Sequence, residues 1–315
     1  MQPVINVVLP VFAIILTGYL AGRFKILGDE GGEVLQRFVF YVAMPVLLFY
    51  AMARVNPQDI MNGPYLTAYL GGQTITFALT LIVAKVLFKR RPAEAALSGM
   101  ASIYGNTGYM GIPLIMAAFG PDWVVPAIIA TIINAAVVMG VVAAIIEADL
   151  SVGDGIMGVV KDVSGALLRN PLLVAPVLGF AWSMTGIGLA APIVTFSQIL
   201  GAAAGPCALF SIGLFLVGKS LRRDPVEVSW MVFLKLLVHP AATWFIAFQI
   251  LEMDVMWATL AVVMAALPTG ANIFILARRY SLSLDRTSAV ILISTVLSVL
   301  TLSVLFSHWS DRLAF

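Results

Sequence analysis

The feature that most constrains this chain is the length of its apolar runs. Stretches such as Val4–Leu20 and Tyr65–Leu87 are apolar almost throughout and show no amphipathic stripe. Runs of about 20 apolar residues are long enough to cross the hydrocarbon core of a bilayer. Of the 315 residues, 61% are hydrophobic and 11% are charged, whereas a soluble domain carries about 25% charged residues. The sequence therefore predicts an all-α polytopic membrane protein.

Ten transmembrane helices are expected, and both halves of the chain contribute five. Their approximate limits are 4–23, 34–53, 64–88, 95–118, 123–147, 171–188, 192–219, 227–250, 255–277 and 287–308. The first is not a cleaved signal peptide, because no basic residue precedes it and its apolar stretch is too long. The single cysteine, Cys207, excludes an internal disulfide. The net charge of +2 gives no reason to expect a nucleic-acid partner.

The basic residues orient this bundle. Fifteen of the 18 Lys and Arg residues fall in the connections on one side, whereas Arg54 and Arg312 lie on the other and Lys235 lies within a span. The fifteen are Arg23, Lys25, Arg37, Lys85, Lys89, Arg90, Arg91, Lys161, Arg169, Lys219, Arg222, Arg223, Arg278, Arg279 and Arg286. By the positive-inside rule this side is cytoplasmic. Both termini are then expected outside, which agrees with an even number of spans.

Short motifs recur in the same order in the two halves. P-x-x-L-F occurs at Pro45–Phe49 and again at Pro206–Phe210, 161 residues later. Leu9–Val11 matches Ala175–Val177 at a separation of 166 residues. Because each half has an odd number of spans, the second half must cross the membrane upside down, as in an inverted-topology repeat. We expect a first repeat at 1–147, a cytoplasmic linker at 148–170 and a second repeat at 171–315.

Each half also contains a helix that its own sequence interrupts. "YGNTGYMGIPL" at 104–114 holds three glycines and Pro113, which is expected to deprive the carbonyl of Tyr109 of its helical partner. "ALPTGANIF" at 266–274 holds Pro268 and Gly270, and Pro268 follows Pro113 by 155 residues. Paired interrupted helices predict a transport site near the bilayer midplane, and half-helix N-termini there favour an anion. The expected substrate-binding residues are Asn106, Thr107, Gly108, Pro113, Pro268, Thr269, Gly270 and Asn272.

Other polar and Pro positions within spans have competing interpretations. Asn134 could join the site or bond a neighbouring helix, and the prolines outside the two interruptions are interpreted as kinks. Ser294, Ser298 and Thr301 are interpreted as a helix-packing stripe. Lys235 and His239 lie four residues apart on one helix face. They could couple transport to charge, or Lys235 could extend to the cytoplasmic surface while His239 caps the kink at Pro240.

At these residues the chain resembles the auxin efflux carrier family, which includes bacterial permeases and plant carriers. The resemblance rests on "NTGYMGIPL", "ALPTGANIFILARRY", "LGAAAGPCALFSIG" and "KLLVHPAATWF" and covers nearly the whole chain. It implies the fold of bile-acid sodium symporters and sodium/proton antiporters, in which spans 4 and 9 cross. Spans 1, 2, 6 and 7 would form a scaffold and spans 3–5 and 8–10 a moving transport domain. It further implies a homodimer, a small organic anion such as auxin or malonate as cargo, and the plasma membrane (in a bacterium, the inner membrane) as location.

The sequence offers few ligands for a coupling ion and few motifs of an enzyme, a channel or a receptor. Acidic residues lie only near span ends, including Glu94, Glu147 and Glu252, where solvated charge is expected. A carboxylate-based sodium site, such as the one that bile-acid symporters build with a Glu beside the span-9 interruption, is therefore not expected, nor is an acid-relay proton pathway. Sodium held only by carbonyls, Asn and Thr stays open, and a sodium-coupled symporter of the bile-acid type is the alternative function. With only His239 and His308 and no H-E-x-x-H motif, we expect no catalytic residues, metal site or cofactor. A channel or receptor would share the hydrophobicity but not the mirrored interruptions.

Overall fold

The computed structural model describes residues 4–55, 62–150, 167–218 and 224–309, together with 158, 161, 164 and 165. Every regular element in these ranges is a helix. The first half contains η1 (Val4–Val8), α1 (Leu9–Arg23), α2 (Asp29–Phe38), η2 (Val39–Ala43), α3 (Met44–Met52), α4 (Gly63–Val86), α5 (Pro92–Ile103), η4 (Thr107–Gly111), α6 (Ile112–Phe119), η5 (Pro121–Trp123), α7 (Val125–Ile133), η6 (Asn134–Val138) and α8 (Met139–Leu150).

The second half follows a comparable order of elements. It contains α10 (Pro171–Ser183), α11 (Ala191–Ala202), α12 (Ala204–Leu216), α13 (Pro225–Phe233), η7 (Leu234–Val238), α14 (His239–Trp244), η8 (Phe245–Ile250), α15 (Val255–Ala266), α16 (Asn272–Arg279) and α17 (Leu284–Trp309). The expected linker 148–170 lies largely outside the described residues. Apart from the short 3-10 segment η5, the η segments are π-helical stretches, and three of them (η2, η6 and η7) join consecutive α-helices into one longer helix.

Within the described residues, seven helical stretches are long and apolar enough to cross a membrane. They are Asn6–Arg23, Glu30–Met52, Gly63–Val86, Pro121–Leu150, Ala191–Leu216, Pro225–Ile250 and Leu284–Trp309. The other three expected spans fall on shorter apolar helices, namely Thr107–Phe119, Pro171–Ser183 and Val255–Ala266. A polytopic all-helical membrane protein is thereby confirmed, and the ten-span inverted repeat stays a prediction.

Local sequence explains where several of these helices begin. The side chain of Asn62 accepts a hydrogen bond from the amide of Tyr65 at the start of α4, and Asn170 does the same for Leu172 at the start of α10. Asp254 accepts from the first amides of α15. Such caps replace helical partners that the first amides lack, which matters most where little water is available.

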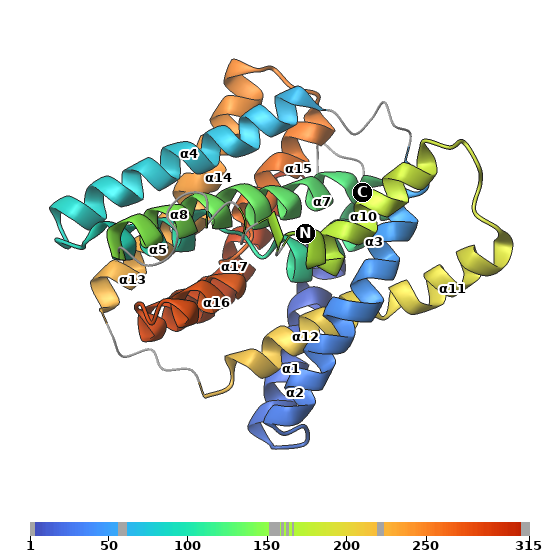
Figure 1. Ribbon diagram of the computed structural model, residues 1–315, viewed down its shortest axis with the longest axis horizontal. Coiled ribbons are helices and arrows are strands. Elements are labelled where there is room, and N and C mark those ends of the chain that lie inside the picture. Colours follow the sequence, from blue (N-terminus) through green and yellow to red (C-terminus); the bar gives the residue numbers. More distant parts are fainter. Residues whose placement is uncertain are drawn as a thin grey trace.

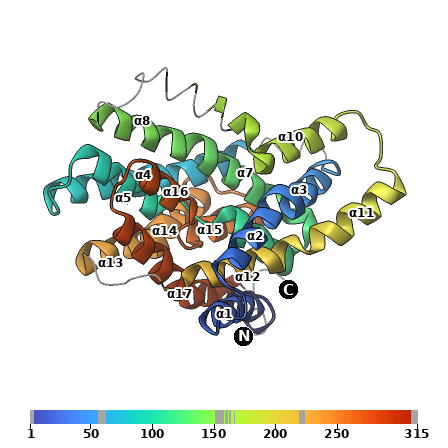
Figure 2. The same ribbon diagram turned by 60° about the horizontal axis from the view of Figure 1, so that its bottom comes forward.

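The helices form two groups that lie side by side. α1, α3, α10, α11 and α12 pack chiefly on one another, with α2 against α12. α4, α5, α8, α13, α14, α15, α16 and α17 make the other set of mutual contacts. Figures 1 and 2 show the first group towards the right and lower part of the molecule and most of the second towards the left. The first group contains the helices of expected spans 1, 2, 6 and 7, and their role as a scaffold stays a prediction.

Glycines allow the first group to pack closely. A Cβ atom on Gly18 of α1 would lie 2.0 Å from the carbonyl oxygen of Phe210, and one on Gly213 of α12 would lie 2.0 Å from the carbonyl oxygen of Ile15. Any side chain at these two positions would push the helices apart. Close backbone approach through small residues is a usual way to hold helices together in a bilayer, where apolar packing alone gives little preference. The crossing of α1 and α12 is therefore a rigid element.

Candidate substrate site

Two helix interruptions lie at the centre of the second group. α5 ends at Ile103 and the chain runs extended to Asn106 before η4 begins at Thr107. α15 ends at Ala266 and α16 begins at Asn272. Pro268 has no amide hydrogen, so the carbonyl of Met264 has no helical donor, and α15 ends there. The sequence thus correctly located both interruptions.

The two interruptions pair with each other through their backbones. The amide of Asn106 donates to the carbonyl oxygen of Pro268 at 2.8 Å, and the amide of Gly270 donates to that of Tyr104 at 2.9 Å. Gly105 and Thr269 form an isolated antiparallel bridge. Extended backbone at membrane depth is tolerated only where protein or water satisfies it. Here each interruption supplies hydrogen-bond partners for the backbone of the other. Either interruption alone would leave those backbone groups without partners.

Side chains behind the bridge hold it in place. The hydroxyl of Thr269 donates to the carbonyl oxygen of Ala101 at 2.8 Å, and its amide donates to Oγ of Ser294 at 3.1 Å. Nδ2 of Asn134 donates to the carbonyl oxygen of Gly105 at 3.2 Å, and its Oδ1 accepts from Gln73 at 2.8 Å. The stripe residue Ser294 therefore does more than pack helices, because it bonds the second interruption directly.

Pro113 does not cause the first interruption, contrary to the sequence expectation. It stands eight residues after Gly105, inside the continuous helical stretch Thr107–Phe119, and its ring lies against α12, where a Cβ on Gly205 would be 3.4 Å from Cβ of Pro113. The π-helical turn η4 comes directly before it, so Pro113 distorts this helix without ending it. The helix ends that correspond are Ile103 and Ala266, 163 residues apart. That separation is closer to the 161 and 166 of the other motif pairs than the 155 between Pro113 and Pro268.

A cavity of about 470 Å³ lies against the paired interruptions. Of the expected binding residues it is lined by Asn106, Thr107, Gly108, Gly270 and Asn272. Pro113, Asn134, Pro268 and Thr269 do not line it; the last three stand behind the bridge, as its supports. The first residues of the half-helices η4 and α16 thus face one space, together with their amide and hydroxyl side chains.

The opposite wall of this cavity comes from the first group of helices, which the sequence analysis missed. It includes Gln36, Phe40 and Tyr41 of α2 and η2, and Ser211 and Phe215 of α12. These residues lie on uninterrupted helices, so no local sequence signal distinguishes them. Arg37 and Glu33 also line the cavity and form an exposed ion pair at 2.6 Å. Because α2 follows the basic connection at Arg23 and Lys25, the cavity lies towards the side expected to be cytoplasmic.

A second cavity, of about 770 Å³, lies between the same two groups at the other end of the molecule. One wall is made by Tyr50 and Arg54 of the α3 end and by Gln198 of α11. The other includes Asp122 of η5 and Trp257 of α15. Between the two cavities, α12 contacts η4 and α6. The groups are therefore in contact at their middle and separated by a cavity at each end.

Lys235 and His239 lie behind the second interruption and not in either cavity. Both side chains are fully buried, so Lys235 does not extend to the surface, and that interpretation was wrong. Nζ of Lys235 lies 2.6 Å from the carbonyl oxygen of Ala265 and 3.2 Å from Nδ1 of His239. Lys235 therefore contacts the last turn of α15 directly.

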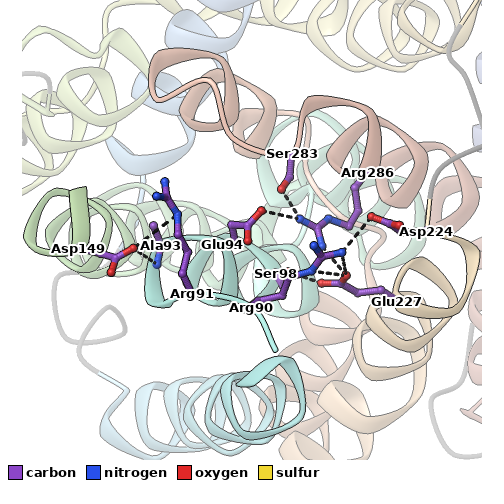
Figure 3. Close-up of polar contacts among 10 residues, drawn as sticks. All are labelled: Arg90, Arg91, Ala93, Glu94, Ser98, Asp149, Asp224, Glu227, Ser283 and Arg286. Atoms are coloured by element: carbon purple, nitrogen blue, oxygen red, sulfur yellow. Dashed lines mark hydrogen bonds and ion pairs between the residues drawn. The ribbon is translucent and has the colours of Figure 1, made fainter. Parts of the chain in front are cut away.

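A buried acid, Glu227, escaped the sequence analysis because it stands at the start of an expected span. Figure 3 shows it among residues near the N-terminal ends of α5, α13 and α17. It accepts hydrogen bonds from Arg286, from Ser98 at 3.2 Å and from Arg90 at 2.8 and 3.0 Å. Burial disfavours the charge of Arg90, but Glu227 and the nearby carboxylates outweigh this and raise the pKa of Arg90.

Two acids expected to be solvated are paired instead. Glu94 lies 3.6 Å from Arg286 in the same charge cluster, as Figure 3 shows, and Asp149 accepts from the amide of Ala93. Glu147 is largely buried and accepts a hydrogen bond from the hydroxyl of Tyr280 at 2.6 Å. These three acids pair with Arg286, Arg91 and Arg279, which lie near helix ends. None of the three lines either cavity.

The comparisons with known proteins agree with this architecture. The model of a family described as "Membrane transport protein" matches residues 3–154 and 156–306. The chain belongs to this family. The resemblance to auxin efflux carriers is thereby confirmed, and membership implies transport rather than catalysis.

Several curated relatives match over almost their full length. A protein of Rhizobium meliloti (strain 1021) named "Putative malonate transporter" is 31% identical over 306 residues, which cover 96% of this chain and 95% of the relative. An uncharacterized transporter of Methanothermobacter thermautotrophicus is 27% identical over 94% of this chain and 95% of the relative. Another, of Escherichia coli (strain K12), is 26% identical over 93% of each. All three names denote transporters.

Proposed function

We propose that this protein is a secondary transporter that carries a small organic anion by alternating access. The observation that carries the proposal is the cavity at the paired interruptions, which both half-helix beginnings line. Helix beginnings present unpaired amides and a partial positive charge, which suit a carboxylate. Asn106, Asn272 and Thr107 add side-chain donors, and a carboxylate accepts several such bonds at once.

The two groups of helices suggest how access alternates. The first group would be the fixed scaffold (spans 1, 2, 6 and 7), and the second would be the transport domain (spans 3–5 and 8–10), within a ten-span inverted repeat. Cavities separate the two groups at both ends, and contacts of η4 and α6 with α12 close the path between them. Sliding or rocking of the second group against α12 would close the cytoplasmic cavity. The bound anion would then be open to the cavity at the other end of the molecule.

The bilayer and oligomer assignments follow from the outer surface. Exposed apolar side chains such as Leu16, Val177 and Ile199 cover α1, α10 and α11 of the scaffold group. Such a surface suits lipid and a second copy of the chain, so we assign the protein as a homodimer of the plasma membrane (in a bacterium, the inner membrane). The basic connections would face the cytoplasm and both termini the outside.

Binding measurements on purified protein test the cargo assignment. Malonate and a series of mono- and dicarboxylates are titrated by thermal shift, since a bound ligand stabilises the folded protein. We expect at least one carboxylate to bind, and Asn106→Ala and Asn272→Ala to weaken it by about tenfold or more, because each lost hydrogen bond to a charged group is worth about 1.5–3 kcal/mol. Gln249→Ala, an exposed amide of η8, is the matched control. Unchanged affinity in both cavity variants would contradict the proposal.

A further inference from the structure

The end of α15 leaves a carbonyl group without its helical partner. In an uninterrupted helix the carbonyl oxygen of Ala265 would accept from the amide of Thr269, four residues on. That amide instead donates to Oγ of Ser294 at 3.1 Å. The last carbonyls of a helix also carry its partial negative charge. The buried end of α15 therefore offers an oxygen ligand in a negative field.

Lys235 occupies this position. Its Nζ donates to the carbonyl oxygen of Ala265 at 2.6 Å and lies 3.2 Å from Nδ1 of His239, and neither side chain is exposed. In the described part of the chain, these two groups are its polar partners, and no carboxylate lies within ion-pair distance. An ammonium group has three donors and no acceptor. A carbonyl oxygen and an imidazole nitrogen are acceptors that serve an ammonium group as they would serve a metal cation.

The first interruption meets the same need differently. There the carbonyl oxygen of Ala101, which lies near the end of α5, accepts from the hydroxyl of Thr269 at 2.8 Å. A neutral hydroxyl satisfies one half-helix, and a lysine satisfies the other. The two helix ends therefore differ in the group that bonds their last carbonyls. This difference places a potential positive charge at the end of α15.

We propose that the Lys235 ammonium is a built-in cation that takes the place of a bound alkali ion at the end of α15. The inference rests on the proposed function, because it explains how such a carrier holds its broken helix and balances an anion without sodium. Lys235 belongs to the group of helices assigned as the transport domain, so its charge would travel with the anion. Neither sodium nor potassium would then be needed to complete the fold of that domain.

Thermal unfolding of the cargo-free protein in different salts tests this proposal independently of the cargo. Wild-type protein should unfold at the same temperature in NaCl, KCl and choline chloride of equal concentration. Lys235→Ala should unfold at a lower temperature in choline chloride. n-Propylammonium, which replaces the atoms that the substitution removes, should raise the unfolding temperature of Lys235→Ala by about 2 °C or more. n-Propanol, which has a similar shape but no charge, should not raise it. Lys85→Ala, a surface lysine of α4, should respond to none of these additions.

Three outcomes would overturn the inference. The first is stabilisation of the wild type by sodium over choline, which would reveal a separate ion site. The second is equal rescue of Lys235→Ala by propanol, or no rescue, which would show that the site needs no charge. The third concerns the case in which Lys235→Ala does not fold, where the stabilities of Lys235→Arg and Lys235→Met are compared instead. A Met variant as stable as the Arg variant would show that the site does not require a positive charge. Failure of every carboxylate to bind would sink the proposed function but leave these results interpretable.

Discussion

Two buried regions of this protein hold basic side chains in different ways. At the N-terminal ends of α5, α13 and α17, Arg90 and Arg286 meet the carboxylate of Glu227, which is 2% exposed. At the interruption, Lys235 is fully buried, and its polar partners among the described residues are a carbonyl oxygen and an imidazole. In the first region, opposite charges compensate one another. In the second, a single basic group faces a helix end.

The difference indicates different roles. A compensated cluster joins three helix ends at fixed distances, so its loss should affect folding. A lone buried lysine should contribute less to stability than the compensated cluster, because taking an amine out of water is costly unless it is well paired. Its persistence at the end of α15 is better explained by charge at the crossing. Intramembrane ionisable groups without such a role are rare.

The largest predicted effect concerns the compensated cluster. Glu227→Gln should lower the free energy of unfolding by about 3–5 kcal/mol, because it leaves the buried guanidinium group of Arg286 and the partly buried one of Arg90 without their shared carboxylate. Denaturant titration in detergent measures the change. Glu33→Gln removes the exposed pair with Arg37, whose side chains are 71% and 65% exposed, and should cost less than about 1 kcal/mol. Equal losses in the two variants would mean that burial of the cluster contributes nothing.

A smaller loss of stability is expected at the interruption. Lys235→Met keeps the volume of the side chain but leaves the carbonyl of Ala265 without its donor, so unfolding should become easier by about 2 kcal/mol. In Lys235→Met, uptake per folded molecule should fall about tenfold or more. In Glu227→Gln, uptake per folded molecule should fall less than it does in Lys235→Met. Uptake into proteoliposomes, normalised to folded protein, compares them. The opposite ranking would make Lys235 a structural residue and Glu227 a functional one.

The smallest effect should come from the neutral counterpart of Lys235. Thr269→Val removes the hydroxyl that bonds Ala101 and keeps the shape of the side chain, so we expect a loss of about 1 kcal/mol. Thr17→Val is the control, since the hydroxyl of Thr17 bonds the preceding turn of an exposed helix face. Thermal unfolding of both variants measures the difference. A Thr269→Val variant as stable as its control would show that the end of α5 needs no donor.

Sequence reasoning located the interruptions but not their partners. Pro268 and the glycines disrupt helices through local chemistry, which a sequence displays directly. The bonds of Thr269 to Ala101 and Ser294 join positions that are distant along the chain, so only the fold reveals them. For the same reason Pro113 was assigned to the wrong feature. A proline is equally visible in a sequence whether it ends a helix or only distorts one, as Pro113 does within Thr107–Phe119.

The charged residues were harder to interpret than the apolar ones. Runs of apolar residues predicted every long helix, because the length of a span is set by the bilayer. Burial of Glu227 depends on two arginines from other connections, and burial of Lys235 depends on the end of a helix thirty residues away. Neither dependence has a local signature. The cavity wall that the first group of helices makes, including Phe40 and Ser211, was missed because those helices are continuous.

The central claim is that the cavity at the paired interruptions holds the cargo. Ala271 lines this cavity, and Ala202 lines the one at the other end. Each is replaced by cysteine in a Cys207→Ala background and treated with a membrane-impermeant thiol reagent from either side of oriented vesicles. In the conformation of this structure, Ala271→Cys should react from the cytoplasmic side, and a transported carboxylate should slow that reaction. Ala202→Cys should react only from outside, and the carboxylate should not slow its reaction. Reaction of Ala271→Cys that no transported carboxylate slows would contradict the claim.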